Sequence, residues 1–191
     1  MKSQHTCVVS NGRPARRGLV RGAEGAQLLE FALVLPMLLV IVFGAADFGK
    51  AWALKDKLSN AARDGARIAA SQSRADLTQT NPPSVQALRD VIANYQTSAN
   101  VTTCVIGTTA TSAGPFAWQY TSTSTGCGAF LLKIERNYTF VSGTTTIQAT
   151  RVTLTYPLTW NIGRLMKLMI PSSTLGNSVN ITTTAVMQNL T

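Results

Sequence analysis

The chain has 191 residues, of which 45% are hydrophobic and only 13% are charged, and its formal net charge is +9. This length allows one modest domain together with a membrane anchor. The single histidine, His5, lies close to the start, so Ser-His and Cys-His catalysis and the usual zinc sites are excluded for the rest of the chain. The later basic residues are scattered and form no basic patch interleaved with aromatic residues, which excludes the ordinary pattern of a nucleic-acid-binding protein.

Residues 1–25 form a polar, basic segment with five Lys or Arg residues and one Glu. No apolar periodicity runs through it, so we expect a disordered leader rather than part of a folded domain. Basic residues that flank a membrane span are retained on the cytoplasmic side. The leader therefore predicts a cytoplasmic N-terminus.

A long apolar run follows at residues 28–46. As a helix it would be roughly 28 Å long at about 1.5 Å per residue, close to the thickness of the hydrocarbon core of a bilayer. A cleaved secretory signal has a shorter apolar core, so we expect the span to be retained, although the small residues at 44–46 leave a signal-peptidase cut open. Pro36 removes one helical hydrogen bond and predicts a kink, which is either static or helps extraction from the bilayer.

The junction between leader and span combines Gly25, Ala26, Glu30 and Phe31. A glutamate at the edge of a span is costly and suggests a function. A cut after Gly25 would make Ala26 the new N-terminus, and its amine would lie one helical turn from Glu30. Pairing with the amine offsets the cost of placing the carboxylate in a low dielectric. These four residues predict a processing site, and the alternative is a solvated Glu30 at the edge of an ordinary signal anchor.

The helix is expected to continue past the span, over about residues 27–73, because residues on one face recur at spacings of three and four. The small residues on this face are Gly44, Ala51, Ala61 and Gly65. Small side chains let helices approach closely in or near a bilayer. The sequence leaves two interpretations open: this face packs on another helix, or it packs on the protein's own domain.

A break at residues 81–84 separates this helix from a second one, for which Ser84 is the expected N-cap and which ends near Thr97. Beyond residue 100 the pattern changes to period 2 with β-branched residues, which indicates strands. The expected strands are residues 101–108, 116–121, 130–141, 147–160 and 178–188, with a hairpin turn at 142–145 and a short helix or loop at 162–170.

The sum is an α+β fold in which a long N-terminal transmembrane helix continues into a small globular domain with a mostly antiparallel β-sheet. The expected divisions are a leader at residues 1–25, a helix at 26–73 and an exported domain at 74–191.

Two cysteines, Cys104 and Cys127, remain once the leader with Cys7 is set aside. An even pair in an exported chain favours a disulfide, which would stabilise the domain by about 3 kcal/mol in the chain-entropy estimate. Two unrelated buried thiols are the alternative. The nearby aromatic residues Trp118 and Tyr120, and Trp160 further on, are expected either in the core or, in a ligand-binding domain, in an exposed patch.

The junction and the apolar run together resemble a known family. Gly25 followed by Ala-Gln-Leu-Leu-Glu-Phe-Ala-Leu-Val-Leu-Pro, and the later Phe-Gly-Ala-Ala-Asp-Phe-Gly at 43–49, are similar to the TadE-like pseudopilins of tight-adherence (Flp-type) pilus systems. This match covers about residues 21–65. A weaker similarity lies in residues 152–158 and 181–187, and none in 74–145.

The resemblance implies a pseudopilin, that is, a minor pilin or pilus-assembly factor, whose leader a prepilin peptidase removes after Gly25. It implies a single-pass protein of the inner membrane with a periplasmic C-terminal domain, either retained there or incorporated into the extracellular pilus. The implied partners are that peptidase, other pilins, the inner-membrane assembly proteins and the lipid bilayer. No cofactor, metal, nucleic acid or small-molecule substrate is expected, and no enzymatic activity. The alternative is an uncleaved single-pass anchor that carries a periplasmic binding or adhesion domain.

Overall fold

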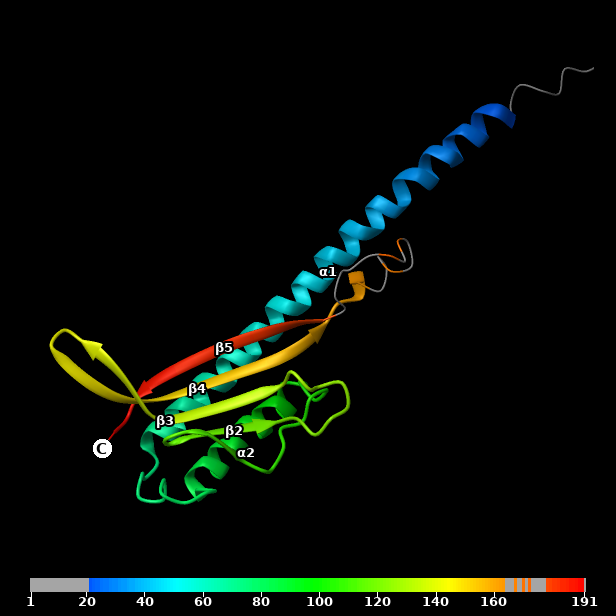
Figure 1. Ribbon diagram of the computed structural model, residues 1–191. Helices are drawn as coiled ribbons and strands as arrows, with labels where there is room; N and C mark the ends of the chain where they lie inside the picture. The colour runs from blue at the N-terminus through cyan, green and yellow to red at the C-terminus, as the bar shows by residue number, and fades with distance from the viewer. Residues whose placement is uncertain (1–20, 164–166, 168–169, 171, 173–177, 191) are drawn as a thin grey trace, which may run out of the picture. The chain divides into compact units, whose positions relative to one another are not determined.

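The computed structural model describes residues 21–163, 167, 170, 172 and 178–190 (Figure 1). It divides into two units, one that ends at Val42 and one that comprises Phe43–Thr191. The first described element is helix α1, Arg21–Ser71, which contains Pro36 and contributes to both units. The helix begins within the expected leader, six residues before the predicted start at residue 27. The rest of that leader, residues 1–20, lies outside the described residues.

Helix α2, Pro83–Ser98, follows the predicted break, but its N-cap is Pro82 and not Ser84. Two prolines occupy the N-cap and first helical positions, where a missing N–H costs nothing. Ser84 instead gives its backbone N–H and its hydroxyl to the carboxylate of Asp76, at 2.8 and 2.9 Å. The prediction of Ser84 as the cap was therefore wrong, because a neighbouring carboxylate accepts both of its donors.

The second unit contains one five-stranded antiparallel sheet in which the strands lie in chain order. The α+β fold and the antiparallel sheet predicted from the sequence are confirmed. The strands are β1 (Thr111–Gly114), β2 (Ala117–Thr121), β3 (Leu131–Ser142), β4 (Thr145–Thr159) and β5 (Ser178–Gln188). The turn between β3 and β4 falls where it was predicted, and Gly143 adopts there a φ of 64°, in the left-handed region that favours glycine.

The predicted strand at residues 101–108 is wrong, because this segment forms only an isolated bridge between Ile106 and Ser122. Val101, Cys104 and Ile106 are buried and Val105 is 54% exposed, so these apolar residues reach the core without a hydrogen-bonded ladder. The short strand β1 was not predicted. Of the expected helix or loop at residues 162–170, residues 162, 163 and 167 are described as helical.

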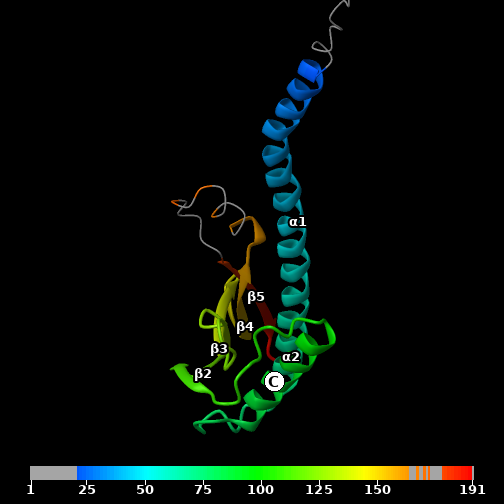
Figure 2. The ribbon, with the colours of Figure 1, turned by 90° about the vertical axis from the view of Figure 1, so that its right-hand side faces the viewer.

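The core of the second unit lies between a helical layer and the sheet (Figure 2). Alternate residues of the two longest strands point into it, as in a half-buried antiparallel sheet. The disulfide between Cys104 and Cys127 is present, with an S–S distance of 2.03 Å, and confirms the predicted pairing. The fully or nearly buried residues include Leu58, Ala62, Ala66 and Ala69 from α1, Val85, Leu88 and Ile92 from α2, and Leu132, Ile134, Val152 and Leu154 from the sheet.

Candidate processing and membrane sites

The predicted processing residues all lie on α1, and Gly25, Ala26, Glu30 and Phe31 are all exposed. A Cβ atom added at Gly25 would meet nothing within 4 Å. The fold therefore does not need a glycine here for space. Glycine in a helix is less favourable than alanine by roughly 0.5–1 kcal/mol, so this residue weakens the helix. No close contact among the described residues offsets that loss. Glu30 follows Ala26 by four residues on the helix, which places the two on the same face.

The segment after Glu30 exposes large apolar side chains along the first half of α1. Leu28, Leu33 and Met37 are 71%, 75% and 68% exposed. By length and composition the helix can cross a membrane, with a mean hydropathy of 2.5 in its most apolar window, none of which is buried within the protein. A buried core helix would hide such residues, whereas this one presents them outward, as a bilayer-spanning segment does. Pro36 lies within this stretch.

The four small residues of the predicted helical face lie in different surroundings. Gly65 packs on α2, where an added Cβ would lie 2.9 Å from Ile92 Cδ1, and Ala61 is buried in the same core. Gly44 faces Ile162, and Ala51 is half-buried. For Ala61 and Gly65 the neighbours therefore belong to the protein's own domain, the second of the two interpretations that the sequence left open.

Asp47 forms a buried polar contact at the start of the second unit, and no role for it was predicted from the sequence. Its side chain is 2% exposed. Its carboxylate accepts hydrogen bonds from Asn161 Nδ2 at 3.0 Å and from the Ile162 backbone N–H at 2.8 Å, and Lys50 Nζ lies 3.7 Å away. Burial raises the pKa of Asp47, but the hydrogen bonds from Ile162 and Asn161 outweigh it and leave the pKa below its ordinary value. The carboxylate thus ties the end of β4 to α1. A lone Asp on a face of small and apolar residues was the available signal.

Arg136 is a second buried charge, and no pattern in the sequence predicted it. Its guanidinium donates to the carbonyls of Gln72 and Ser73, at 2.9 and 3.4 Å, just beyond the end of α1. A cation near a helix C-terminus interacts favourably with the helix dipole. Burial, and to a lesser extent the positive charge of Arg74, lowers the pKa of Arg136. The contact fixes the end of α1 to β3.

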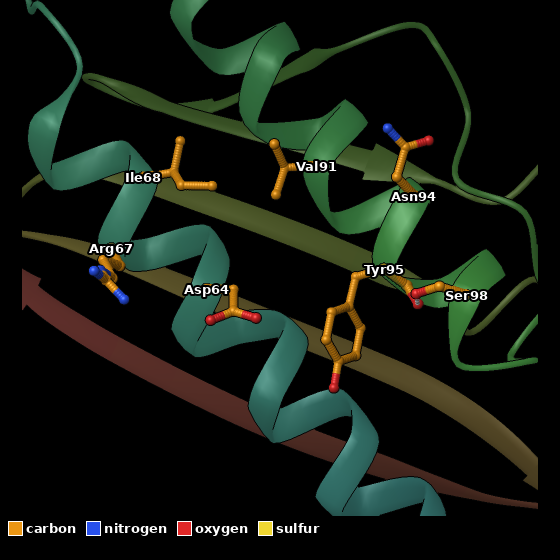
Figure 3. Close-up of a pocket in the computed structure, with 7 residues that line it drawn as sticks. All are labelled: Asp64, Arg67, Ile68, Val91, Asn94, Tyr95 and Ser98. Atoms are coloured by element: carbon orange, nitrogen blue, oxygen red, sulfur yellow. Dashed lines mark hydrogen bonds between the residues drawn. The ribbon is translucent and has the colours of Figure 1, made fainter.

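A shallow groove of about 650 Å³ separates α1 from α2 on the outer side of the helical layer (Figure 3). Three of its residues come from α1 and four from α2, and the Tyr95 side chain reaches across toward α1 (Figure 3). Within the described part of the chain, no group of three or more His, Cys, Asp or Glu side chains is placed to hold a metal ion. The lining residues are Asp64, Arg67, Ile68, Val91, Asn94, Tyr95 and Ser98.

These features define an α+β protein with one N-terminal apolar helix of membrane-spanning length and a small disulfide-bonded domain. Residues 25–67 match the family model of the TadE-like proteins, which confirms the resemblance predicted from the sequence. Comparisons with curated proteins and with solved structures give no significant match. The family match and the apolar helix together fit a pilin-like membrane protein of a tight-adherence system.

Proposed function

We propose that this protein is a pseudopilin of a tight-adherence pilus, either a minor pilin or an assembly factor, whose leader a prepilin peptidase removes after Gly25. Residues 28–46 anchor it in the inner membrane, with the N-terminus cytoplasmic and the disulfide-bonded domain in the periplasm. Its partners are other pilins and the inner-membrane assembly proteins. Its role is structural and involves no catalysis.

The surroundings of Gly25 carry this proposal. The glycine is exposed, has open space around it and lies in a helix that it weakens, so the folded chain supplies no reason for it. The family match begins at this same residue. A peptidase that must bring the scissile bond close to its catalytic carboxylates does supply a reason, because glycine has the least steric bulk and extends easily.

Cleavage would also give Glu30 a partner. The new amine of Ala26 is cationic at neutral pH and lies at position i relative to Glu30 at i+4. The two groups can pair within one chain or between neighbouring chains. In a low dielectric such a pair is strongly favoured over a lone carboxylate, so it can set the register of one subunit against the next.

The decisive experiment is the intact mass of membrane-extracted protein for the wild type and two glycine variants. Gly25→Val should abolish processing, because a β-branched side chain does not fit the extended, close-packed cleavage site. Gly49→Val is the matched control, since Gly49 is also exposed, also lies in α1 and also has open space around it. We expect the control to lose residues 1–25 as the wild type does. A shortened mass for Gly25→Val would contradict the assigned cut.

The groove between α1 and α2 supports a second candidate, an uncleaved anchor that carries a periplasmic binding domain. Its lining combines apolar and polar side chains, as small binding clefts do. This candidate predicts a full-length mass for the wild-type protein. It also predicts normal surface pili in cells that lack the protein, whereas the pseudopilin proposal predicts their loss.

A further inference from the structure

A second pocket, of about 320 Å³, opens on the second unit where three separate segments meet. The second half of α1, the segment that follows α2, and β4 each contribute side chains to it. Its volume falls within the roughly 300–1,000 Å³ of small binding sites. All of its lining residues belong to the second unit and to the described part of the chain, so one folded unit fixes its geometry.

Hydrogen bonds hold the three sides of this pocket together. Lys57 Nζ on α1 donates to the carbonyl of Ala99, just beyond the end of α2, at 2.8 Å. The backbone N–H of Cys104 donates to the Tyr156 hydroxyl on β4 at 3.2 Å, and the disulfide ties Cys104 to Cys127. The segment after α2 is thus joined both to α1 and to β4. A pocket that is formed before its ligand arrives binds at a lower entropic cost.

The lining of the pocket combines apolar side chains with two positive charges. Leu54, Val101 and Leu158 supply apolar surface. Lys50 and Lys57 supply two ammonium groups, and among the described residues no Asp or Glu lines the pocket. Charge-assisted hydrogen bonds between ammonium and carboxylate groups are stronger than those between neutral groups. The chemistry of the pocket therefore favours a ligand that carries a carboxylate beside an apolar group.

Both ammonium groups keep donors for such a ligand, since each has three N–H groups. Within the described part of the chain, Lys57 gives one donor to Ala99 and forms no ion pair. Lys50 Nζ lies 3.7 Å from the carboxylate of Asp47, beyond hydrogen-bonding distance, and that carboxylate already accepts two hydrogen bonds. The two lysines are seven residues, or about two helical turns, apart and therefore share one face of α1.

The charge of the second unit argues against another copy of this chain as the ligand. Residues 43–191 contain 12 Lys or Arg and 6 Asp or Glu residues, a net charge of +6. Two such units repel each other, whereas complementary charge steers association and selects the partner. We propose that the pocket binds an acidic side chain, flanked by apolar residues, from a different protein. This interaction surface lies wholly in the second unit, and the proposal rests neither on the membrane span nor on processing at Gly25.

Amide NMR spectra of the full-length protein in a nonionic detergent can test this assignment. The probe is the peptide acetyl-Leu-Glu-Leu-amide, and the matched control is acetyl-Leu-Gln-Leu-amide, which has nearly the same shape and no charge. We expect the Glu peptide to shift the amides of residues 100, 101, 103 and 158 in a saturable manner. The Gln peptide should bind about tenfold more weakly, because it loses the charge-assisted hydrogen bonds to both lysines.

Variants of the two lysines test the same contact from the side of the protein. Lys50→Met and Lys57→Met should each weaken binding of the Glu peptide about fivefold, the range of one partly exposed ion pair. Lys55→Met is the matched control, an exposed lysine of α1 that does not line this pocket, and should leave the affinity unchanged. Lys50→Met decides the result if Lys57→Met, which also loses the contact with Ala99, disturbs the fold.

Equal affinity for the two peptides, or unchanged affinity in the lysine variants, would overturn the proposal. Three further results would refute it by naming another ligand or place. Sodium acetate that displaces the peptide at equal concentration would make this a site for small free carboxylates. Shifts of the same amides when the protein alone is concentrated would make it a contact between copies. Shifts confined to Tyr95 and Ser98 would move peptide binding to the groove between α1 and α2.

Discussion

The two halves of α1 have the same backbone conformation and opposite surroundings. In the first half, residues 25–42, large apolar side chains such as Leu28 and Leu33 are more than two-thirds exposed. In the second half, residues 43–71, small side chains such as Ala62 and Ala69 are fully buried. The first half therefore presents an apolar surface that the second unit does not bury, and under the proposed function lipid and other subunits cover it, whereas the second half packs within the protein.

Small side chains explain why the second half of α1 can pack closely within the folded domain. Gly65 lets α1 approach α2 closely, because Ile92 occupies the space that a side chain there would fill, and Ala61, Ala62 and Ala66 are buried in the same core. Interiors are packed as densely as organic crystals, so a larger side chain here would have no room. The first half has no such restriction, and its residues are large because each buried methylene adds to the favourable transfer into lipid.

Among substitutions that act on only one half of α1, Glu30→Gln in the first half should have the largest effect, a loss of surface pili. The substitution keeps the shape of the side chain and removes the charge that would pair with the Ala26 amine. Processing after Gly25 and membrane insertion should be normal, but surface pili should fall to background when counted by electron microscopy. Asp64→Asn is the matched control, an exposed carboxylate in the second half of α1, and should leave piliation unchanged. Normal piliation in the Glu30→Gln strain would make Glu30 a tolerated headgroup residue.

Loss of the disulfide should affect only the second unit. Replacing both Cys104 and Cys127 by alanine should lower the free energy of unfolding by about 3 kcal/mol, because the unfolded chain regains the entropy of the closed loop. The thermal midpoint in detergent should fall by roughly 6–12 °C. Reductant added to the wild type should produce a similar fall, and should leave the midpoint of the double variant unchanged. An equal midpoint with and without reductant in the wild type would argue against the stabilising role.

Close packing in the second half is tested by Gly65→Val. A Cβ added at this position would lie 2.9 Å from Ile92 Cδ1. Valine would add two further carbons to this buried contact. Overpacking of this kind costs about 1–3 kcal/mol, measured as a lower midpoint in denaturant. Gly49→Val, in open space on the same helix, should be neutral. Processing should remain intact in both variants, since the cleavage site lies in the first half. A stable Gly65→Val variant would show that α2 can move away from α1.

The smallest effect concerns the outer face of the sheet. Hydrogen bonds from Arg151, one of them 2.8 Å long, hold the pKa of Glu135 below its ordinary value of 4.5, and Lys133 at 3.1 Å lowers it further. Because the folded-state pKa is depressed, this stabilisation is complete above the unfolded pKa and is lost as the pH falls through the folded one. For a partly exposed pair the loss should stay below about 1 kcal/mol. Unfolding midpoints of the wild type and Glu135→Gln should converge on acidification, and a constant gap would contradict the assignment.

Local patterns in the sequence determined a large part of this protein. The apolar run and the Gly25–Glu30 spacing identified the family segment that the comparison confirmed. The period-2 pattern predicted the strand at residues 147–160, which corresponds to β4, and the hairpin turn at 142–145 that precedes it. These features depend on one segment at a time, through hydropathy, periodicity or a single permissive dihedral angle, so the sequence shows them directly.

Contacts between distant segments were decided only by the tertiary structure. Asp47 is buried because Asn161 and Ile162, more than a hundred residues later, supply its donors. Ser84 does not cap α2 because Asp76 accepts its hydrogen bonds, and Val101, Cys104 and Ile106 are buried although their segment does not join the sheet. No local pattern encodes such partners, since the energy of a buried polar group depends on what the rest of the chain brings to it.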